Sequence, residues 1–231
     1  MTFRFVPAPS VSAAVGSRFS VRAFLGRPVD GGMLRDILRR ASRSPSGGNL
    51  QPWRIVVLGG NELNAFKTAV AERLKTAPTP DPELYPIYPP ELGEPYRSNR
   101  FRCGEMLYGL LGVPREQKAE RMQWFQRNYT FFGAPVGLLC YVDRCMGSAQ
   151  WSDLGMYLQT LMLLLREQGL DSCPQECWSV YHRTVEQFVQ QAPELTLFCG
   201  MAIGYADPEA AVNRLETERL PLEQFATFRG I

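Results

Sequence analysis

Residues 44–58 read SPSGGNLQPWRIVVL, a stretch that joins a helix to a strand. The run at 54–58 is short, apolar and rich in β-branched residues, so it predicts a buried strand. Upstream, Asp30 is placed to cap a helix whose apolar face recurs at a spacing of three and four, at Leu34, Ile37, Leu38 and Ala41. Pro45, Gly47 and Gly48 end that helix. The expected order is therefore helix, polar glycine-rich loop, strand.

Downstream, the apolar pattern alternates between helical and strand character. It predicts helices over 63–74, 154–165 and 178–190, with Gly169 stopping the second of them, and strands over 137–142 and 195–203. Strands separated by helices indicate a mixed α/β core. Nothing in the pattern demands a parallel doubly wound sheet, since no GxGxxG or GxxxxGK[ST] phosphate loop follows a strand.

Seven prolines interrupt the chain between positions 78 and 95. Proline fits neither a helix interior nor a central strand, so this stretch is a long excursion from the core. A linker and a lid over a site are both consistent with it.

The composition is that of a globular chain of 231 residues with 45% hydrophobic content and a net charge of only +2. That is enough to bury the core of one domain, or of one domain plus a subunit interface. The weak net charge gives no field to attract nucleic acid or a membrane. Without a secretory signal or a membrane-length apolar run, we expect a cytoplasmic protein whose six cysteines stay reduced.

Two segments carry residues suited to a cofactor. Residues 18–24 read RFSVRAF, which places Arg18, Ser20 and Arg22 on one side of an extended segment, where they suit an anionic phosphate. A solvated basic turn is the alternative. In the 44–53 loop, glycines allow close approach of a flat ligand, and Asn49 and Gln51 offer donors and acceptors to a heteroaromatic edge. An ordinary helix-to-strand loop is the alternative there.

Taken together, these segments resemble the nitroreductase family of FMN-dependent NAD(P)H oxidoreductases. The resemblance starts with the pattern Arg18, Ser20, Arg22 and Phe24, followed by PS at 45–46, Asn49 and QPW at 51–53. It continues with PQE at 174–176, and it ends with GMAIGY at 200–205, VNR at 212–214 and RLP at 219–221. The matches lie at the start, the late middle and the end of the chain.

The resemblance implies an α+β fold with a mixed, mostly antiparallel central sheet flanked by helices. It implies one nitroreductase-like domain over 1–231, with a proline-rich lid at about 76–130. It also implies an obligate intertwined homodimer that holds two FMN molecules at the interface, each touched by both subunits.

Cofactor contacts are implied residue by residue. Arg18 and Arg219 would bind the phosphate, Ser20 the phosphate or the ribityl chain, and Arg22 would lie near the N1/O2 edge of the ring. There a guanidinium would stabilise the negative charge that develops on reduction. The partner subunit would approach the same flavin with Pro45, Ser46 and Asn49, while Gln175 and Glu176 would present backbone to its N5 edge.

One position departs from the family pattern. Some relatives carry a lysine two residues before the phosphate-binding arginine, where this chain has Thr217.

The region from 76 to 129 matches only loosely, although YRSNRF at 96–101 and YGLLG at 108–112 are similar to a subgroup associated with nitroaromatic acids. Arg97, Arg100 and Arg102 are either a solvated face or a means of attracting a substrate carboxylate.

The implied activity is reduction of small nitroaromatic or quinone-type molecules with NADH or NADPH, by a ping-pong mechanism. Because the flavin carries the redox chemistry, no side chain is expected to act as a catalytic acid or base. The alternatives are a same-fold flavoenzyme for reductive dehalogenation or substrate oxidation, and a non-catalytic flavin-binding protein. No metal is expected, because Cys173 and Cys177 have no zinc-spaced partners, and His182, the single histidine, is expected to have a solvated or packing role and not a catalytic one.

Overall fold

The computed structural model describes residues 4–231, whose centre is a five-stranded sheet. The strands are β1 (Phe24–Leu25), β2 (Arg54–Gly59), β3 (Val136–Asp143), β4 (Asp171–Gln175) and β5 (Leu195–Ala206). They follow the order β1-β5-β3-β2, with β4 also paired to β5, and every strand pair is antiparallel. A single isolated parallel bridge joins Ser20 to Ser172 in the described chain. The expected mostly antiparallel sheet is confirmed.

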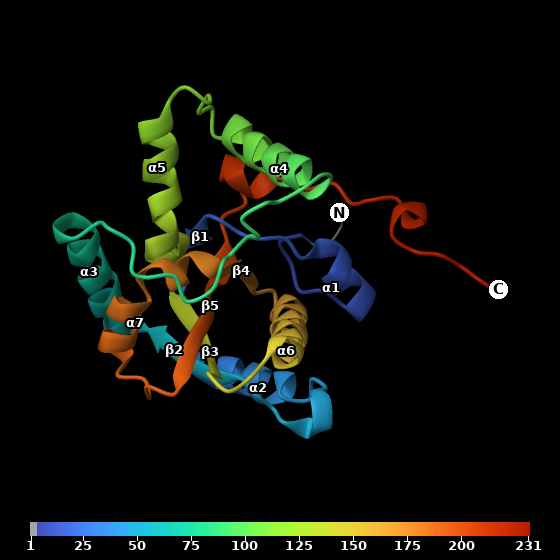
Figure 1. The fold of residues 1–231 in the computed structure, drawn as a ribbon, viewed down its shortest axis with the longest axis horizontal. Coiled ribbons are helices and arrows are strands. Elements are labelled where there is room, and N and C mark those ends of the chain that lie inside the picture. Colours follow the sequence, from blue (N-terminus) through green and yellow to red (C-terminus); the bar gives the residue numbers. More distant parts are fainter. Residues whose placement is uncertain (1–3) are drawn as a thin grey trace.

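Helices cover both faces of this sheet (Figure 1). The α-helices of residues 4–231 are α1 (Val11–Ser17), α2 (Gly31–Ala41), α3 (Gly60–Thr76), α4 (Tyr96–Leu110), α5 (Lys118–Gln126), α6 (Ser148–Glu167) and α7 (His182–Val189). One core cluster joins α2 and α6 to the sheet, and a second joins α3 and α7 to its other face. Within residues 4–231, none of these helices has the length and apolar character needed to span a bilayer.

The strand β3 shows why the sheet lies between two layers. Leu138 and Cys140 belong to the cluster beneath α6, whereas Leu139 and Tyr141 belong to the cluster beneath α3. Successive side chains of a strand point to opposite faces, so a strand covered on both sides reads as a continuous apolar run. This explains the sequence GLLCYV at 137–142.

Several predicted elements are confirmed with shifted ends. Asp30 caps α2 as expected, since its Oδ1 accepts a hydrogen bond from the Met33 amide at 2.6 Å. Gly169 adopts a φ of +73° just after α6, the left-handed geometry that suits glycine at a helix end. The helix itself begins at Ser148, earlier than predicted.

Two predictions about elements are corrected. The strand predicted as buried at 54–58 is β2, which lies at the sheet edge and buries only Leu58, because β3 is its sole neighbour among the described strands. The helix predicted over 178–190 is divided into a 3₁₀ segment, Glu176–Tyr181, and α7. The apolar spacing across the two segments is nearly continuous, so it hid the change in helix type.

The start of the proline-rich excursion is tied to the core. Tyr181 donates its hydroxyl to the Pro78 carbonyl at 2.7 Å, and Tyr85 donates to the carbonyl of Phe198. His182 is buried and places Nε2 3.2 Å from the Pro82 carbonyl, so of the two roles expected for it, solvated or packing, the structure shows packing. The excursion is therefore anchored up to about residue 85.

Beyond that anchor, the excursion carries α4 and α5, which stand away from the sheet (Figure 1). Neither helix contains a buried residue. Their stability depends on contacts at their edges, such as the ion pair of Arg121 with Glu105 at 2.7 Å. This part of the chain can therefore change its position at low energetic cost.

A buried ion pair fastens α6 to β4. Arg166 and Asp171 are 1% and 2% exposed and lie 2.8 Å apart. Arg166 also donates to the carbonyls of Leu170 and Val6, and Asp171 accepts from the amide of Ala206 at 3.1 Å. Burial raises the pKa of Asp171 to about 6, although the neighbouring Arg166 opposes the shift.

Candidate functional site

Four of the predicted cofactor residues line one cleft of about 440 Å³: Arg18, Ser20, Arg22 and Arg219. The cleft lies between the end of α1, the extended segment after it and the chain at 215–219. Arginine and serine side chains from positions almost two hundred residues apart therefore meet at one surface. The alternating positions 18, 20 and 22 share one side, as their spacing predicts.

The local structure explains this alternation. The amide of Val21 donates to the Ser172 carbonyl at 3.1 Å, which holds the segment extended along β4. Val21 and Ala23 are buried on the inner side, so the residues between them face the cleft. Asn213, fully buried, accepts from the Arg22 amide and donates to the Ala23 carbonyl. Asn213 thus joins the extended segment at 18–23 to the chain that leads into 215–219, a role that the sequence did not predict.

The electrostatics of the cleft favour an anion. Burial lowers the pKa of the Arg18 guanidinium, and the nearby charge of Arg219 lowers it further. Neither a hydrogen bond nor a carboxylate partner to this guanidinium is found within residues 4–231. Arginine nevertheless keeps its charge in proteins. Two neighbouring cations, one of them without a partner, fit the phosphate end of a nucleotide such as FMN.

Gln175 and Glu176 follow at the end of β4 and do not line the cleft. The Gln175 side chain points into the core, where its Nε2 donates to the Asn128 carbonyl at 2.9 Å and its Oε1 accepts from Trp178. Only its backbone is left for a ligand. Burial raises the pKa of the Glu176 carboxyl.

The loop with Pro45, Ser46 and Asn49 lies after α2, at the opposite end of the molecule from α4 (Figure 1). The three residues are not brought to the Arg18 cleft within one chain. The loop is held by α6: the buried carboxylate of Asp153 accepts a hydrogen bond from the Gly47 amide at 3.3 Å. A ligand in the cleft could meet this loop only in a second copy of the chain.

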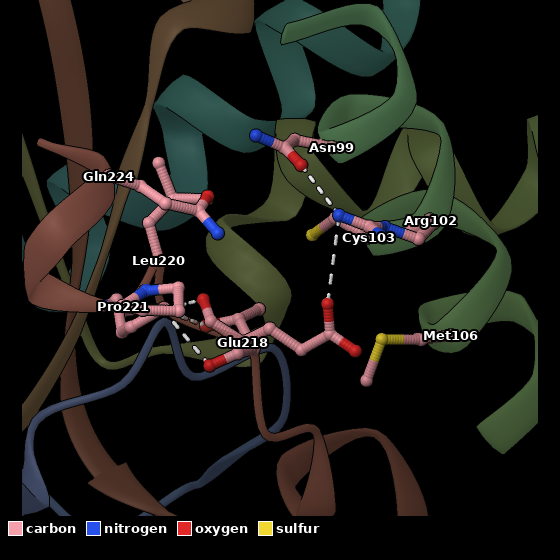
Figure 2. Close-up of a pocket in the computed structure, with 10 residues that line it drawn as sticks. Asn99, Arg102, Cys103, Met106, Glu218, Leu220, Pro221 and Gln224 are labelled. Carbon is pink, nitrogen blue, oxygen red and sulfur yellow. Dashed lines mark hydrogen bonds and ion pairs between the residues drawn. The ribbon is translucent and has the colours of Figure 1, made fainter. Parts of the chain in front are cut away.

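A second cavity of about 390 Å³ adjoins the cleft and shares Cys103, Thr217 and Arg219 with it. Figure 2 shows it between α4 and the chain at 217–224, with Arg102 reaching in from the helix. The three arginines of α4 that sequence analysis grouped together are thus separated. Arg97 and Arg100 line a different cavity, of about 870 Å³, on another face of the helix.

Known proteins resemble most of this chain. The model of the nitroreductase family matches residues 15–205. A nitrobenzene nitroreductase from Ectopseudomonas oleovorans is 35% identical over 96% of this chain and 97% of its own length. A 4-nitrobenzoate reductase from Pseudomonas putida is 36% identical over 94% of this chain and 95% of its own length. The crystal structure of the FMN and NADPH-dependent nitroreductase NfnB from Sphigopyxis sp. strain HMH superimposes with a TM-score of 0.92, at 48% identity, over 96% of this chain and 100% of that one.

The chain belongs to the nitroreductase family. The predicted family and its α+β fold are therefore confirmed.

Proposed function

We propose that the protein is an FMN-dependent oxidoreductase that uses NAD(P)H to reduce small nitroaromatic or quinone-type molecules. The observation that carries this proposal is the cleft lined by Arg18, Ser20, Arg22 and Arg219. The Arg18 guanidinium in it is half-buried and has no protein partner within residues 4–231. The named relatives, which reduce nitrobenzene and 4-nitrobenzoate, support the substrate class. FMN, when held by these residues, would supply the redox chemistry that links NAD(P)H oxidation to reduction of the aromatic molecule.

Each predicted cofactor residue, in the cleft or outside it, has a role in this proposal. Arg18 and Arg219 hold the phosphate by charge-assisted hydrogen bonds, and Ser20 adds a hydroxyl. Arg22 provides positive charge toward the N1/O2 edge of the ring, where reduction adds negative charge. Gln175 and Glu176 offer backbone groups toward N5, and Pro45, Ser46 and Asn49 complete the site from a partner subunit.

A homodimer is part of the proposal, and the C-terminal segment supports it. This segment extends from the body of the molecule (Figure 1) and carries five exposed apolar side chains: Leu220, Leu222, Phe225, Phe228 and Ile231. A single chain would leave them in water, whereas a second copy could bury them. Because all six cysteines are free, we also propose a reducing compartment, the cytoplasm.

The test is the visible absorption spectrum of the purified protein during an anaerobic reaction cycle. NADH or NADPH should bleach the bands of oxidised flavin, and a nitrobenzoate added afterwards should restore them. A protein that is colourless and cannot be reconstituted with FMN would contradict the proposal. Preferential turnover of halogenated phenols would indicate dehalogenation, and a flavin that NAD(P)H does not bleach would indicate a non-catalytic protein.

Asp153 offers a test of the loop that completes the site. Replacing it with alanine should weaken FMN binding several-fold, because the Gly47 amide loses the carboxylate that orients residues 45–49. Asp153→Asn keeps one acceptor oxygen and should retain most of the affinity. Dissociation constants from the quenching of flavin fluorescence measure both. Equal affinity in the alanine variant and the wild type would exclude this role.

A further inference from the structure

The helix α4 directs one of its faces at the C-terminal segment. Asn99, Arg102, Cys103 and Met106 recur at a spacing of three and four, and together they form one wall of the 390 Å³ cavity (Figure 2). The opposite wall is the chain at 217–221 and Gln224. Arg219 belongs both to this wall and to the cleft of Arg18, so the two spaces adjoin at that residue.

Arg102 is the cation of this wall, and its present contacts are weak. Its Nη2 donates to Asn99 Oδ1 at 2.7 Å and lies 3.7 Å from the Glu218 carboxylate. The side chains of Arg102 and Glu218 are 56% and 68% exposed, and an ion pair that is so long and so exposed adds little free energy. A phosphate dianion can instead accept two parallel charge-assisted bonds from one guanidinium, which is a much stronger contact.

Besides Arg18, two other arginines of the cleft, Arg4 and Arg219, have protein partners. Arg4 pairs with Glu216 at 3.0 Å, donates to the Leu215 carbonyl and lies over the Phe19 ring. Arg219 uses Nη1 for bonds to Thr217 and to the Glu218 carbonyl, which leaves its remaining nitrogens for a ligand. Position 217 supplies no charge. Of the arginines that have a carboxylate partner here, Arg102 is thus released at less cost than Arg4.

We propose that Arg102 of α4 is a third phosphate-binding cation, which exchanges Glu218 for the phosphate of FMN when the cofactor binds. The inference rests on the proposed function and adds a residue to it. It has a structural consequence, because α4 contains no buried residue and is held only at its edges. A phosphate shared by Arg18, Arg219 and Arg102 would join the cleft to α4, so cofactor binding would also order this helix.

The test compares FMN with riboflavin, which lacks the phosphate, on apoprotein of the full chain. Arg102→Gln should weaken FMN binding roughly tenfold to a hundredfold and leave riboflavin binding unchanged. Arg97→Gln is the matched control, because Arg97 lies on the same helix and pairs with Glu94 of its own segment at 2.9 Å. Glu218→Gln should bind FMN as tightly as the wild type or more tightly, because it releases Arg102.

Each outcome decides a separate question. Wild-type affinity for FMN in Arg102→Gln would overturn the inference. So would an equal loss in Glu218→Gln and Arg102→Gln, because it would mean that the ion pair only positions the 217–219 segment. Failure of the wild type to bind FMN at all would contradict the proposed function instead. Limited proteolysis gives a second readout: FMN should protect residues 86–117 in the wild type, and equal protection in Arg102→Gln would overturn the ordering of α4.

Discussion

Arg18→Ala lowers the affinity for FMN roughly 10- to 100-fold, and the variant that also carries Arg219→Ala is purified without flavin. This is the result we expect, because each guanidinium makes charge-assisted bonds worth about 1.5–3 kcal/mol and the Arg18 guanidinium has no protein partner within residues 4–231 to return to. Fluorescence titration of the apoprotein with FMN measures the dissociation constants directly.

Two controls separate a loss of the phosphate contact from a general loss of structure. Riboflavin should bind the Arg18→Ala variant as it binds the wild type. Arg39→Ala, an exposed arginine on α2 that pairs with Asp36 of the same helix, should leave FMN affinity unchanged. Full flavin retention in Arg18→Ala and in Arg219→Ala would show that the phosphate lies elsewhere.

Arg166→Met should lower the free energy of unfolding by about 3–5 kcal/mol, the range for breaking one side of a buried ion pair. Methionine fills similar space but leaves the Asp171 carboxylate buried without its cation, and the carbonyls of Val6 and Leu170 lose a donor. Urea unfolding followed by circular dichroism measures the change. The matched control is Arg40→Met, which removes a surface ion pair with Glu167 at 2.7 Å and should cost less than about 1 kcal/mol.

The deficit of Arg166→Met should depend on pH in a defined direction. The pKa of Asp171 is already raised to about 6 in the folded protein, and removing Arg166 raises it further. Below that pKa the carboxyl is protonated when folded, while the unfolded chain does not take up the proton until near pH 4. The free energy of unfolding of Arg166→Met therefore increases as the pH falls from 8 to 5, and its difference from the wild type should shrink. A deficit that is constant over this range would argue against an uncompensated charge.

Elements whose signal lies in their own residues were predictable from sequence. The helix α2 carries its cap at Asp30 and its apolar face within twelve residues, and β3 is a continuous apolar run. Elements that depend on a neighbour were not. The strand β4 reads DSCPQ, with a proline and polar ends, and it is a strand because it pairs with β5 along its whole length. The helix α4 buries none of its side chains, so it has no apolar face to detect.

The same distinction applies to the site. The alternate spacing within five residues predicts a shared face for Arg18, Ser20 and Arg22. Asp153 and Asn213 act through contacts that span 106 and 191 residues of sequence, which no local pattern can reveal. Arg102 was noticed as a charge, but its separation from Arg97 and Arg100 depends on which elements pack beside each face of α4.

The anchoring of the excursion up to Tyr85 has a consequence for how such a protein diversifies. The chain leaves the core after Tyr85 and returns at Trp124, which packs against the second core cluster, and no residue of α4 or α5 is fully buried. Residues 86–123 therefore form a peripheral segment between two junctions with the core, and this segment can accept new side chains or a new length without refolding the sheet. A graft of this segment from a relative would leave the cleft residues Arg18, Ser20, Arg22 and Arg219 of the recipient in place, because all four lie outside it.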